Sequence, residues 1–126
     1  VLGLSALPSD YPLKVGMLGM HGNIGPNLKT NECDVLIAIG MRFDDRVTGD
    51  LATYAKQAKI IHFDIDVSEI NKNVQSYARV LGDVKDTLPL VTKLLSSNKH
   101  QEWINEFKGC YQKEYDIVIK KELFPD

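Results

Sequence analysis

The residues best suited to binding chemistry stand in a short charged stretch just after an apolar run. Val35 to Ile39 is apolar, Gly40 interrupts it, and residues 42–46 then read Arg-Phe-Asp-Asp-Arg. Arg42 and Arg46 can bind phosphate through bidentate guanidinium hydrogen bonds. The two aspartates between them can accept hydrogen bonds from hydroxyls or orient the arginines. On spacing alone, a surface turn with salt bridges is an equally good interpretation.

The same order of strand, turn and acid recurs twice further along the chain. Asp64 and Asp66 follow the apolar segment 59–63, and Gly82-Asp83 follows the segment 77–81. The carboxyl ends of parallel strands meet at one edge of a sheet, so we expect these acids to gather there. An acid at that edge often accepts hydrogen bonds from ribose or ribityl hydroxyls. Asp83 can also cap the following helix, and the two roles are compatible.

These acids are positioned by an α/β fold with a three-layer, Rossmann-like parallel sheet. The apolar runs predict strands at 35–39, 59–63 and 77–81. Helical signals predict short helices at 25–32 and 51–55, a helix start with Ser68 as its N-cap, and an amphipathic helix over 83–97 in which Pro89 is discordant. A last helix carries aromatic residues every four positions, a stripe typical of a core or a domain interface: Trp103, Phe107, Tyr111 and Tyr115.

A glycine-rich stretch over 16–22 predicts backbone that passes close to a ligand or another subunit. His21 lies inside it, next to Met20. A lone histidine without a carboxylate or cysteine at ligand spacing is more often a packing or hydrogen-bonding residue than a metal ligand. Met20 is likewise more often a core residue than a cofactor contact. We therefore predict no metal site in this chain.

Composition excludes several classes of function. The formal net charge of −2 leaves no basic face for nucleic acid. No apolar run approaches the roughly 18 residues that span a bilayer. Cys33 and Cys110 are far apart in the sequence, which favours a reduced, cytoplasmic protein over a disulfide framework or a metal site. The chain opens without an initiating Met or a basic n-region, so we expect it to be cut from a longer one.

Four ordered motifs together resemble a known family. They are Gly19-Met20-His21-Gly22, the octapeptide from Arg42 to Gly49, His62-Phe63-Asp64-Ile65-Asp66, and Gly82-Asp83-Val84-Lys85. In this order and at this spacing they resemble the middle of the acetolactate synthase large, catalytic subunit, over residues 1–95. The resemblance implies a subunit of three α/β domains that uses thiamine diphosphate, Mg²⁺ and FAD. It implies an enzyme that joins a decarboxylated pyruvate to a second 2-keto acid in branched-chain amino acid biosynthesis.

The resemblance also implies which residues line the FAD site. They are Leu18, Gly19, Met20, His21, Gly40, Met41, Arg42, Phe43, Asp44, Asp64, Ile65, Asp83 and Val84, with Val1 near the isoalloxazine side. Four residues are implied near the mouth of the substrate channel, where inhibitors of this family bind: Met20, His21, Asp45 and Arg46. The segment 23–27 departs from the alanine-rich helix usual in the family, which leaves its local geometry open.

The motif with which this family binds thiamine diphosphate and its metal is absent from the sequence, so no catalytic residue is predicted. We expect residues 1–97 to be a central FAD-contacting domain truncated at its N-terminal side. Residues 98–126 are expected to be a helix and linker toward the thiamine-diphosphate domain. Such a fragment alone is expected to be inactive, because flavin does no net redox work in the family that the chain resembles.

The implied parent is a cytoplasmic homodimer or homotetramer with a small regulatory subunit. Two alternatives stay open. One is the central domain of another thiamine-diphosphate decarboxylase or oxidase, and the other is a stand-alone nucleotide-binding module.

Overall fold

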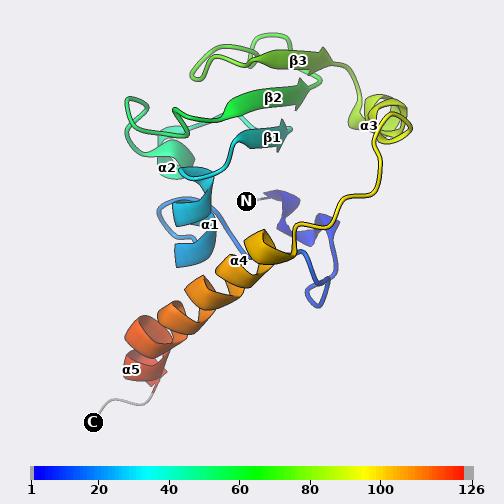
Figure 1. The fold of residues 1–126 in the computed structure, drawn as a ribbon. Coiled ribbons are helices and arrows are strands. Elements are labelled where there is room, and N and C mark those ends of the chain that lie inside the picture. Colours follow the sequence, from blue (N-terminus) through cyan, green and yellow to red (C-terminus); the bar gives the residue numbers. More distant parts are fainter. Residues whose placement is uncertain (1, 124–126) are drawn as a thin grey trace. The chain divides into compact units, whose positions relative to one another are not determined.

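The fold was obtained as a computed structural model that describes residues 2–123 (Figure 1). The chain forms two compact units. One comprises residues 30–98 and contains the sheet, and the other comprises residues 1–29 together with 99–126. Val1, which the resemblance places near the isoalloxazine, lies outside the described residues.

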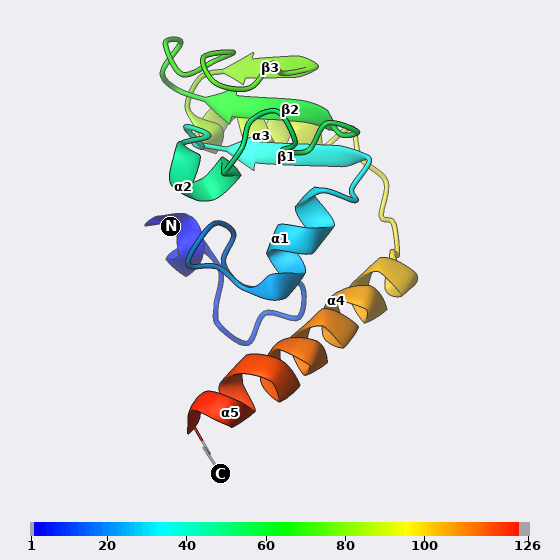
Figure 2. The same cartoon turned by 90° about the vertical axis from the view of Figure 1, so that its left-hand side faces the viewer.

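The unit of residues 30–98 is built on a parallel sheet of three strands in the order β1-β2-β3. The strands are β1 (Val35–Ile39), β2 (Lys59–Asp64) and β3 (Ala78–Leu81), which confirms the three predicted strands. Ile39 pairs with Phe63, and Phe63 pairs with Val80. Because these paired residues stand near the end of each strand, the carboxyl ends of the three strands lie side by side. This alignment brings the residues after each strand to one edge (Figure 2).

One face of the sheet carries the buried core. Side chains alternate between the two faces along a strand, and Ala38 of β1 and Ile60 of β2 lie on the same face. They form one buried cluster with Phe43, Tyr54 and Ala55, which come from the connection between β1 and β2. The residues between these strands are thus held by burial of apolar side chains, the dominant stabilising term in folding.

Helix α3 (Val84–Thr92) lies along the other face of the sheet (Figures 1 and 2). Asp83 is its N-cap, because its side chain accepts a hydrogen bond from Lys85 N. The predicted amphipathic helix is confirmed at its start, but it ends at Thr92 and not at Ser97. Pro89, the discordant residue of the sequence pattern, lies inside the helix. No residue of α3, all of them described, is buried, so this layer packs loosely.

The connections between strands differ from the sequence prediction. No helix forms at 51–55; a short helix α2 (Asp45–Thr48) forms earlier, and 51–57 is a run of turns. Ala55 has φ 45°, a left-handed conformation that a right-handed helix cannot contain. The prediction failed because tertiary packing of buried Ala55 overrides its local helical preference.

Ser68 does not start a helix either. It lies in a run of turns, and its backbone N–H donates to Asp66 Oδ1 at 2.8 Å, so Asp66 and not Ser68 supplies the local cap. The hydroxyl and backbone N–H of Ser68 lower the pKa of the Asp66 carboxyl below its usual value. Asn71 has a φ of 59°, a left-handed conformation that a right-handed helix does not contain, so no helix continues through it.

The second unit packs α1 (Ile24–Thr30) against α4 (Gln101–Glu114). A Cβ added at Gly25 would lie 3.2 Å from Cys110 Cβ and 3.4 Å from Phe107 Cδ1, so glycine lets the helices approach closely. Lys29 forms an ion pair with Glu106, and its ammonium lies 5.0 Å from the centre of the Trp103 ring. The predicted short helix at 25–32 is thereby confirmed, in the segment whose geometry the sequence left open.

The aromatic stripe of α4 packs at its first two members. Trp103 and Phe107 are half-buried and meet edge to face with ring centres 5.6 Å apart. Tyr111 is 64% exposed, so the stripe is only partly core. After α4 the chain continues through a π-helical turn, Tyr115–Ile119, and α5 (Lys120–Leu123), while a 3-10 turn, Leu2–Ala6, stands at the other end of the unit. No helix within residues 2–123 is long and apolar enough to cross a membrane.

Candidate functional site: the carboxyl edge of the sheet

A small cavity opens at the carboxyl ends of the three strands. Its volume is about 160 Å³. Its lining residues are Ile39, Gly40, Phe63, Asp64, Ile65, Gly82, Asp83 and Val84. Five of these are predicted cofactor contacts: Gly40, Asp64, Ile65, Asp83 and Val84. Sites that enclose a whole drug-sized ligand measure roughly 300–1,000 Å³, so the cavity suits one part of a large cofactor.

Asp64 is the buried acceptor of the cavity. It ends β2, is 8% exposed, and its Oδ1 accepts the backbone N–H of Asp66 at 2.9 Å. Its backbone carbonyl accepts the N–H of Gly82 at 2.9 Å, which ties the ends of β2 and β3 together. An ionised carboxylate only accepts hydrogen bonds. The cavity is therefore suited to a hydroxyl or amine donor and unsuited to a phosphate.

Two compatible roles were predicted for Asp83, as a helix cap and as a ligand contact. Its Oδ1 accepts the N–H of Lys85 at 2.9 Å, so the capping role is observed. Asp83 also lines the cavity and is an exposed residue. A ligand contact by Asp83 stays a prediction.

Gly40 gives the cavity an open backbone wall. Its N–H donates to Phe63 O at 2.8 Å, and its φ of 59° lies in the left-handed region that glycine adopts readily. A Cβ built at Gly40 meets no described atom within 4 Å. The space beside this backbone is thus free for a ligand to approach.

The charged loop after β1 lies outside this cavity. The Arg42 side chain is 71% exposed, and its Nη2 lies 3.7 Å from Asp44 Oδ2. The Phe43 side chain is buried in the core and Met41 packs against it, so their side chains face the protein interior. Asn73 holds the loop by donating to the carbonyls of Arg42 and Phe43 at 3.0 and 3.2 Å. Any contact of Phe43 with a ligand is then left to its backbone.

Asp45 and Arg46, the two predicted channel residues of this unit, lie in α2 with exposed side chains. Thr48 is the buried residue of this short helix, and its hydroxyl donates to Asp44 O at 3.1 Å. Thr48 thus fixes α2 while Asp45 and Arg46 stay accessible.

The glycine-rich stretch belongs to the other unit. The Asn27 side chain makes two hydrogen bonds to the backbone of Gly19. Its Nδ2 donates to Gly19 O and its Oδ1 accepts from Gly19 N, both at 2.9 Å. A Cβ at Gly22 would lie 2.3 Å from Met17 O, so only glycine fits there. This tight loop presents an exposed His21 and a Met20 that is 68% exposed. Met20 is therefore not the core residue that its type favours.

Leu18, the remaining predicted contact, is half-buried in the same stretch. The stretch is also held through Asn23, whose Oδ1 accepts Met17 N at 2.8 Å and whose Nδ2 donates to both carboxylate oxygens of Glu114 at 3.2 Å. Glu114 of α4 thereby anchors the loop to its own unit.

Sequence reasoning gave no role to three residues that lie against predicted contacts: Asn27, His62 and Asn73. Asparagine beside a glycine-rich turn is a weak signal for side-chain to backbone hydrogen bonding. His62 was visible as a polar residue inside an apolar strand, and it is completely buried. Asn73 gave no signal, because its partners stand about thirty residues away in the sequence.

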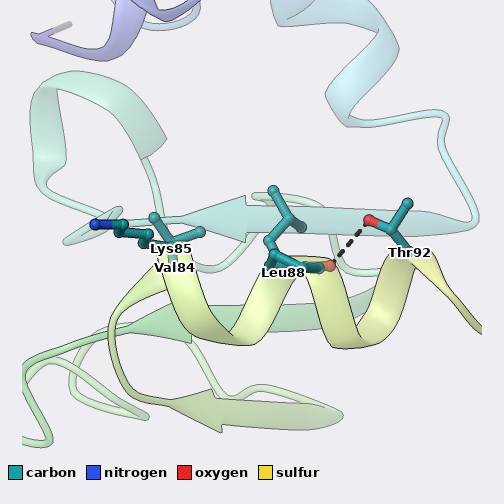
Figure 3. A pocket seen from close by; sticks show the side chains of 5 residues that line it. Val84, Lys85, Leu88 and Thr92 are labelled. Atoms are coloured by element: carbon teal, nitrogen blue, oxygen red, sulfur yellow. Dashed lines mark hydrogen bonds between the residues drawn. The ribbon is translucent and has the colours of Figure 1, made fainter.

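A second hollow runs along α3 and is open on one side. Val84, Lys85, Leu88, Pro89 and Thr92 line it, all from this one helix. Figure 3 shows Leu88 and Thr92 extending from the same side of α3, where the Thr92 hydroxyl donates to Leu88 O at 2.9 Å. This hollow shares one lining residue, Val84, with the cavity at the carboxyl edge. Its lining contains no cluster of acidic or basic residues. Within residues 2–123, no group of three or more His, Cys, Asp or Glu side chains is placed to hold a metal ion.

Comparison with known proteins gives the same family over most of the chain. Residues 1–91 match the family model described as the central domain of thiamine pyrophosphate enzymes. The chain is 44% identical over 114 residues to the acetolactate synthase isozyme 2 large subunit of Escherichia coli (strain K12), covering 90% of this chain and 21% of that protein.

Two further relatives extend this similarity. The chain is 53% identical over 88 residues to a probable acetolactate synthase large subunit of Methanocaldococcus jannaschii, covering 70% of this chain and 15% of that protein. It is 42% identical over 125 residues to a chloroplastic acetolactate synthase of Arabidopsis thaliana, covering 99% of this chain and 18% of that protein. The chain thus spans about a fifth, or less, of the length of these relatives.

Proposed function

Because the chain belongs to the family of central domains of thiamine pyrophosphate enzymes, we propose that it is the FAD-contacting central part of an acetolactate synthase large subunit. The observation that carries the proposal is the cavity at the carboxyl edge of the sheet, where Gly40, Asp64 and Asp83 converge. Open α/β sheets bind their ligands at this edge.

The residues of this edge fit one portion of FAD. Asp64 and Asp83 supply acceptors for sugar or ribityl hydroxyls, and Gly40 leaves room for a ligand beside the backbone. The diphosphate of FAD carries negative charge, which would be repelled by Asp64 and attracted by Arg42. Arg42, with its accessible guanidinium, is the residue we assign to the diphosphate. Bound FAD would supply a structural support for the active site and no net redox chemistry.

The rest of the cofactor set is assigned to the whole enzyme. We place thiamine diphosphate and Mg²⁺ outside this chain, whose sequence lacks the family's binding motif for them. The whole enzyme is proposed to condense decarboxylated pyruvate with a second 2-keto acid. Within this chain, we assign residues 1–97 to the central domain and residues 98–126 to a helix and linker. The chain alone is proposed to be inactive.

Further proposals concern the whole enzyme. We propose that the whole enzyme forms a homodimer or homotetramer that binds a small regulatory subunit. We also propose that it is located in the cytoplasm. The plant relatives are described as chloroplastic, so the location of this protein is to be tested by fractionation.

The experiment uses the whole protein purified without flavin and then titrated with FAD. We expect saturable binding seen as quenching of flavin fluorescence, and acetolactate formation from pyruvate when thiamine diphosphate and Mg²⁺ are present. Asp64→Asn, which keeps the side-chain volume but adds a donor, should weaken FAD binding. Asp10→Asn is the matched control, since Asp10 is exposed and belongs to the unit that does not contain the sheet.

Absence of flavin binding by the wild-type protein would contradict the proposal. Acetolactate formation separates this enzyme from another thiamine-diphosphate decarboxylase or oxidase, which would bind its cofactors without forming this product.

A further inference from the structure

His62 is a completely buried imidazole in the middle of the sheet. It lies on β2, next to Ala38 of β1 and Arg79 of β3 in the strand register. Neither ring nitrogen makes a hydrogen bond to any residue that the structure describes. A buried polar group without a partner destabilises a fold by roughly 1–3 kcal/mol. A cost of this size calls for a role that an apolar side chain could not fill.

The acceptor within reach of His62 is the buried acid of the cavity. Residues two apart on a strand share a face, and His62 Nε2 lies 3.5 Å from Asp64 Oδ2. This separation exceeds an ordinary N–H···O hydrogen bond of about 2.7–3.2 Å. The two atoms thus lie about 0.3 Å beyond the upper end of that range.

One of the two carboxylate oxygens of Asp64 accepts a hydrogen bond in the structure. Oδ1 accepts the N–H of Asp66, and Oδ2 is the oxygen that faces His62. A second hydrogen bond at Oδ2 would fix the plane of the carboxylate. Each carboxylate oxygen has room for a further donor, so Asp64 would still accept a hydroxyl from a ligand in the cavity.

His62 also touches the charged loop through Phe43. The two rings meet edge to face, with centres 5.1 Å apart and planes at 84°. Phe43 follows Arg42 directly and has a φ of 52°, so its side chain anchors a strained turn in the core. The buried ring of His62 thus lies against two parts of the proposed site. One is Asp64, which we assign to a ligand hydroxyl, and the other is the loop that carries Arg42, which we assign to the diphosphate.

We propose that His62 is a positioning residue for the cofactor site: its Nε2–H holds Asp64 Oδ2, so that the carboxylate accepts a hydroxyl of the bound dinucleotide. This inference rests on the proposed function, because it concerns the same edge of the sheet. His62 itself lines no part of the cavity described above. Its effect on the ligand therefore passes through Asp64.

The test compares two replacements of His62 in the whole protein. His62→Leu fills the space without a donor, and His62→Gln offers an amide N–H near the position of Nε2. We expect His62→Leu to weaken FAD binding by about tenfold, the loss expected for one hydrogen bond to a charged group. We expect His62→Gln to restore binding to within about threefold of wild type.

Stability measured without FAD separates positioning from packing. His62→Leu gives up the proposed bond to Asp64 Oδ2, which costs stability, and also removes the buried Nδ1, which has no partner among the described residues. The two effects oppose each other, so the unfolding midpoint in the absence of FAD should stay close to that of the wild type. Ile60→Val is the matched control on the same strand and face. It should lower the unfolding midpoint slightly, with an unchanged FAD affinity.

A double-mutant cycle completes the test. If His62 acts through Asp64, then His62→Leu should weaken FAD binding little further once Asp64→Asn is present. Equal loss of affinity in the Leu and Gln variants, wild-type affinity in the Leu variant, or additive losses in the cycle would each overturn the proposal. If the wild-type protein itself bound no FAD, the proposed function would fail first, and the two failures are thus distinguishable.

Discussion

Arg42 presents its guanidinium to solvent, paired across 3.7 Å with Asp44. An exposed pair at this distance contributes little to stability, about 0–1 kcal/mol. The arginine can therefore leave Asp44 for a phosphate at small cost. The same exposure explains why the sequence could not decide between a surface salt bridge and a phosphate contact: both use an accessible arginine.

Removal of Arg42 tests that choice. We expect Arg42→Ala to weaken FAD binding by about ten- to hundredfold, the range for a hydrogen bond between charged groups. Arg42→Lys should recover part of the loss, because lysine keeps the charge without the bidentate geometry. Flavin fluorescence titration of the whole protein measures both. Lys56→Ala, at an exposed position, controls for net charge, and FAD binding by Arg42→Ala at wild-type affinity would reject the diphosphate role.

Tyr54 gives a second prediction, on stability. Burial, and then the nearby Cys33, raise its pKa to about 12, and its hydroxyl has no hydrogen-bond partner among the described residues. The folded-state pKa exceeds that of a free tyrosine near 10, so the neutral ring stabilises the fold fully below about pH 10. This contribution is lost as the pH rises from there toward 12.

Tyr54→Phe should therefore raise the thermal unfolding midpoint at pH 8, by removing an unpaired buried hydroxyl worth roughly 1 kcal/mol. The advantage over wild type should grow at pH 10.5, where only the wild type has this group to ionise. Tyr77→Phe, at an exposed position, is the control. A variant that loses stability at both pH values would show that the hydroxyl has a stabilising partner.

Among the elements, strands were predicted better than connections. An apolar run such as Val35–Ile39 carries its own signal, since burial on a parallel sheet requires it. The connections depended on Ala55 and Asn71, which both adopt positive φ. The N–H of Ala55 donates to Asn31 Oδ1, 24 residues away in the sequence, whereas Asn71 Oδ1 accepts from Ser76 in the turn that follows. The edge where Asp64 and Asp83 meet was predictable from strand order alone. His62 was not, because a histidine inside an apolar strand gives no sign of what its ring contacts.

The loop over Gly16–Gly22 supports a prediction about a single clamp. Asn27, in α1, makes two hydrogen bonds to the backbone of Gly19. Asn27→Ala removes both, so the backbone N–H of Gly19 should exchange with solvent at least tenfold faster, as one to two kcal/mol of local protection is lost. Asn105→Ala, exposed on α4, is the control. Unchanged exchange at Gly19 would show that Gly22 and Asn23 suffice to hold the loop.

For the whole molecule, the proposed site and the proposed catalysis lie in different parts of the protein. This chain spans about a fifth of the length of its E. coli relative. Its cavity is lined by Asp64 and Asp83, the acids proposed for cofactor hydroxyls, and the sequence lacks the family's motif for thiamine diphosphate. Residues such as Asp64 and Arg42 should then affect activity through FAD occupancy alone.

Excess cofactor should therefore restore activity. Asp64→Asn and Arg42→Ala proteins are expected to make acetolactate slowly at an FAD concentration that saturates the wild type. As FAD is raised about a hundredfold, matching the expected loss of affinity, the maximal rate should return while the KM for pyruvate stays constant. Steady-state rates measured across a grid of FAD and pyruvate concentrations give both quantities. A maximal rate that stays low at saturating FAD would mean that these residues take part in catalysis itself, because occupancy of the site would no longer limit the reaction.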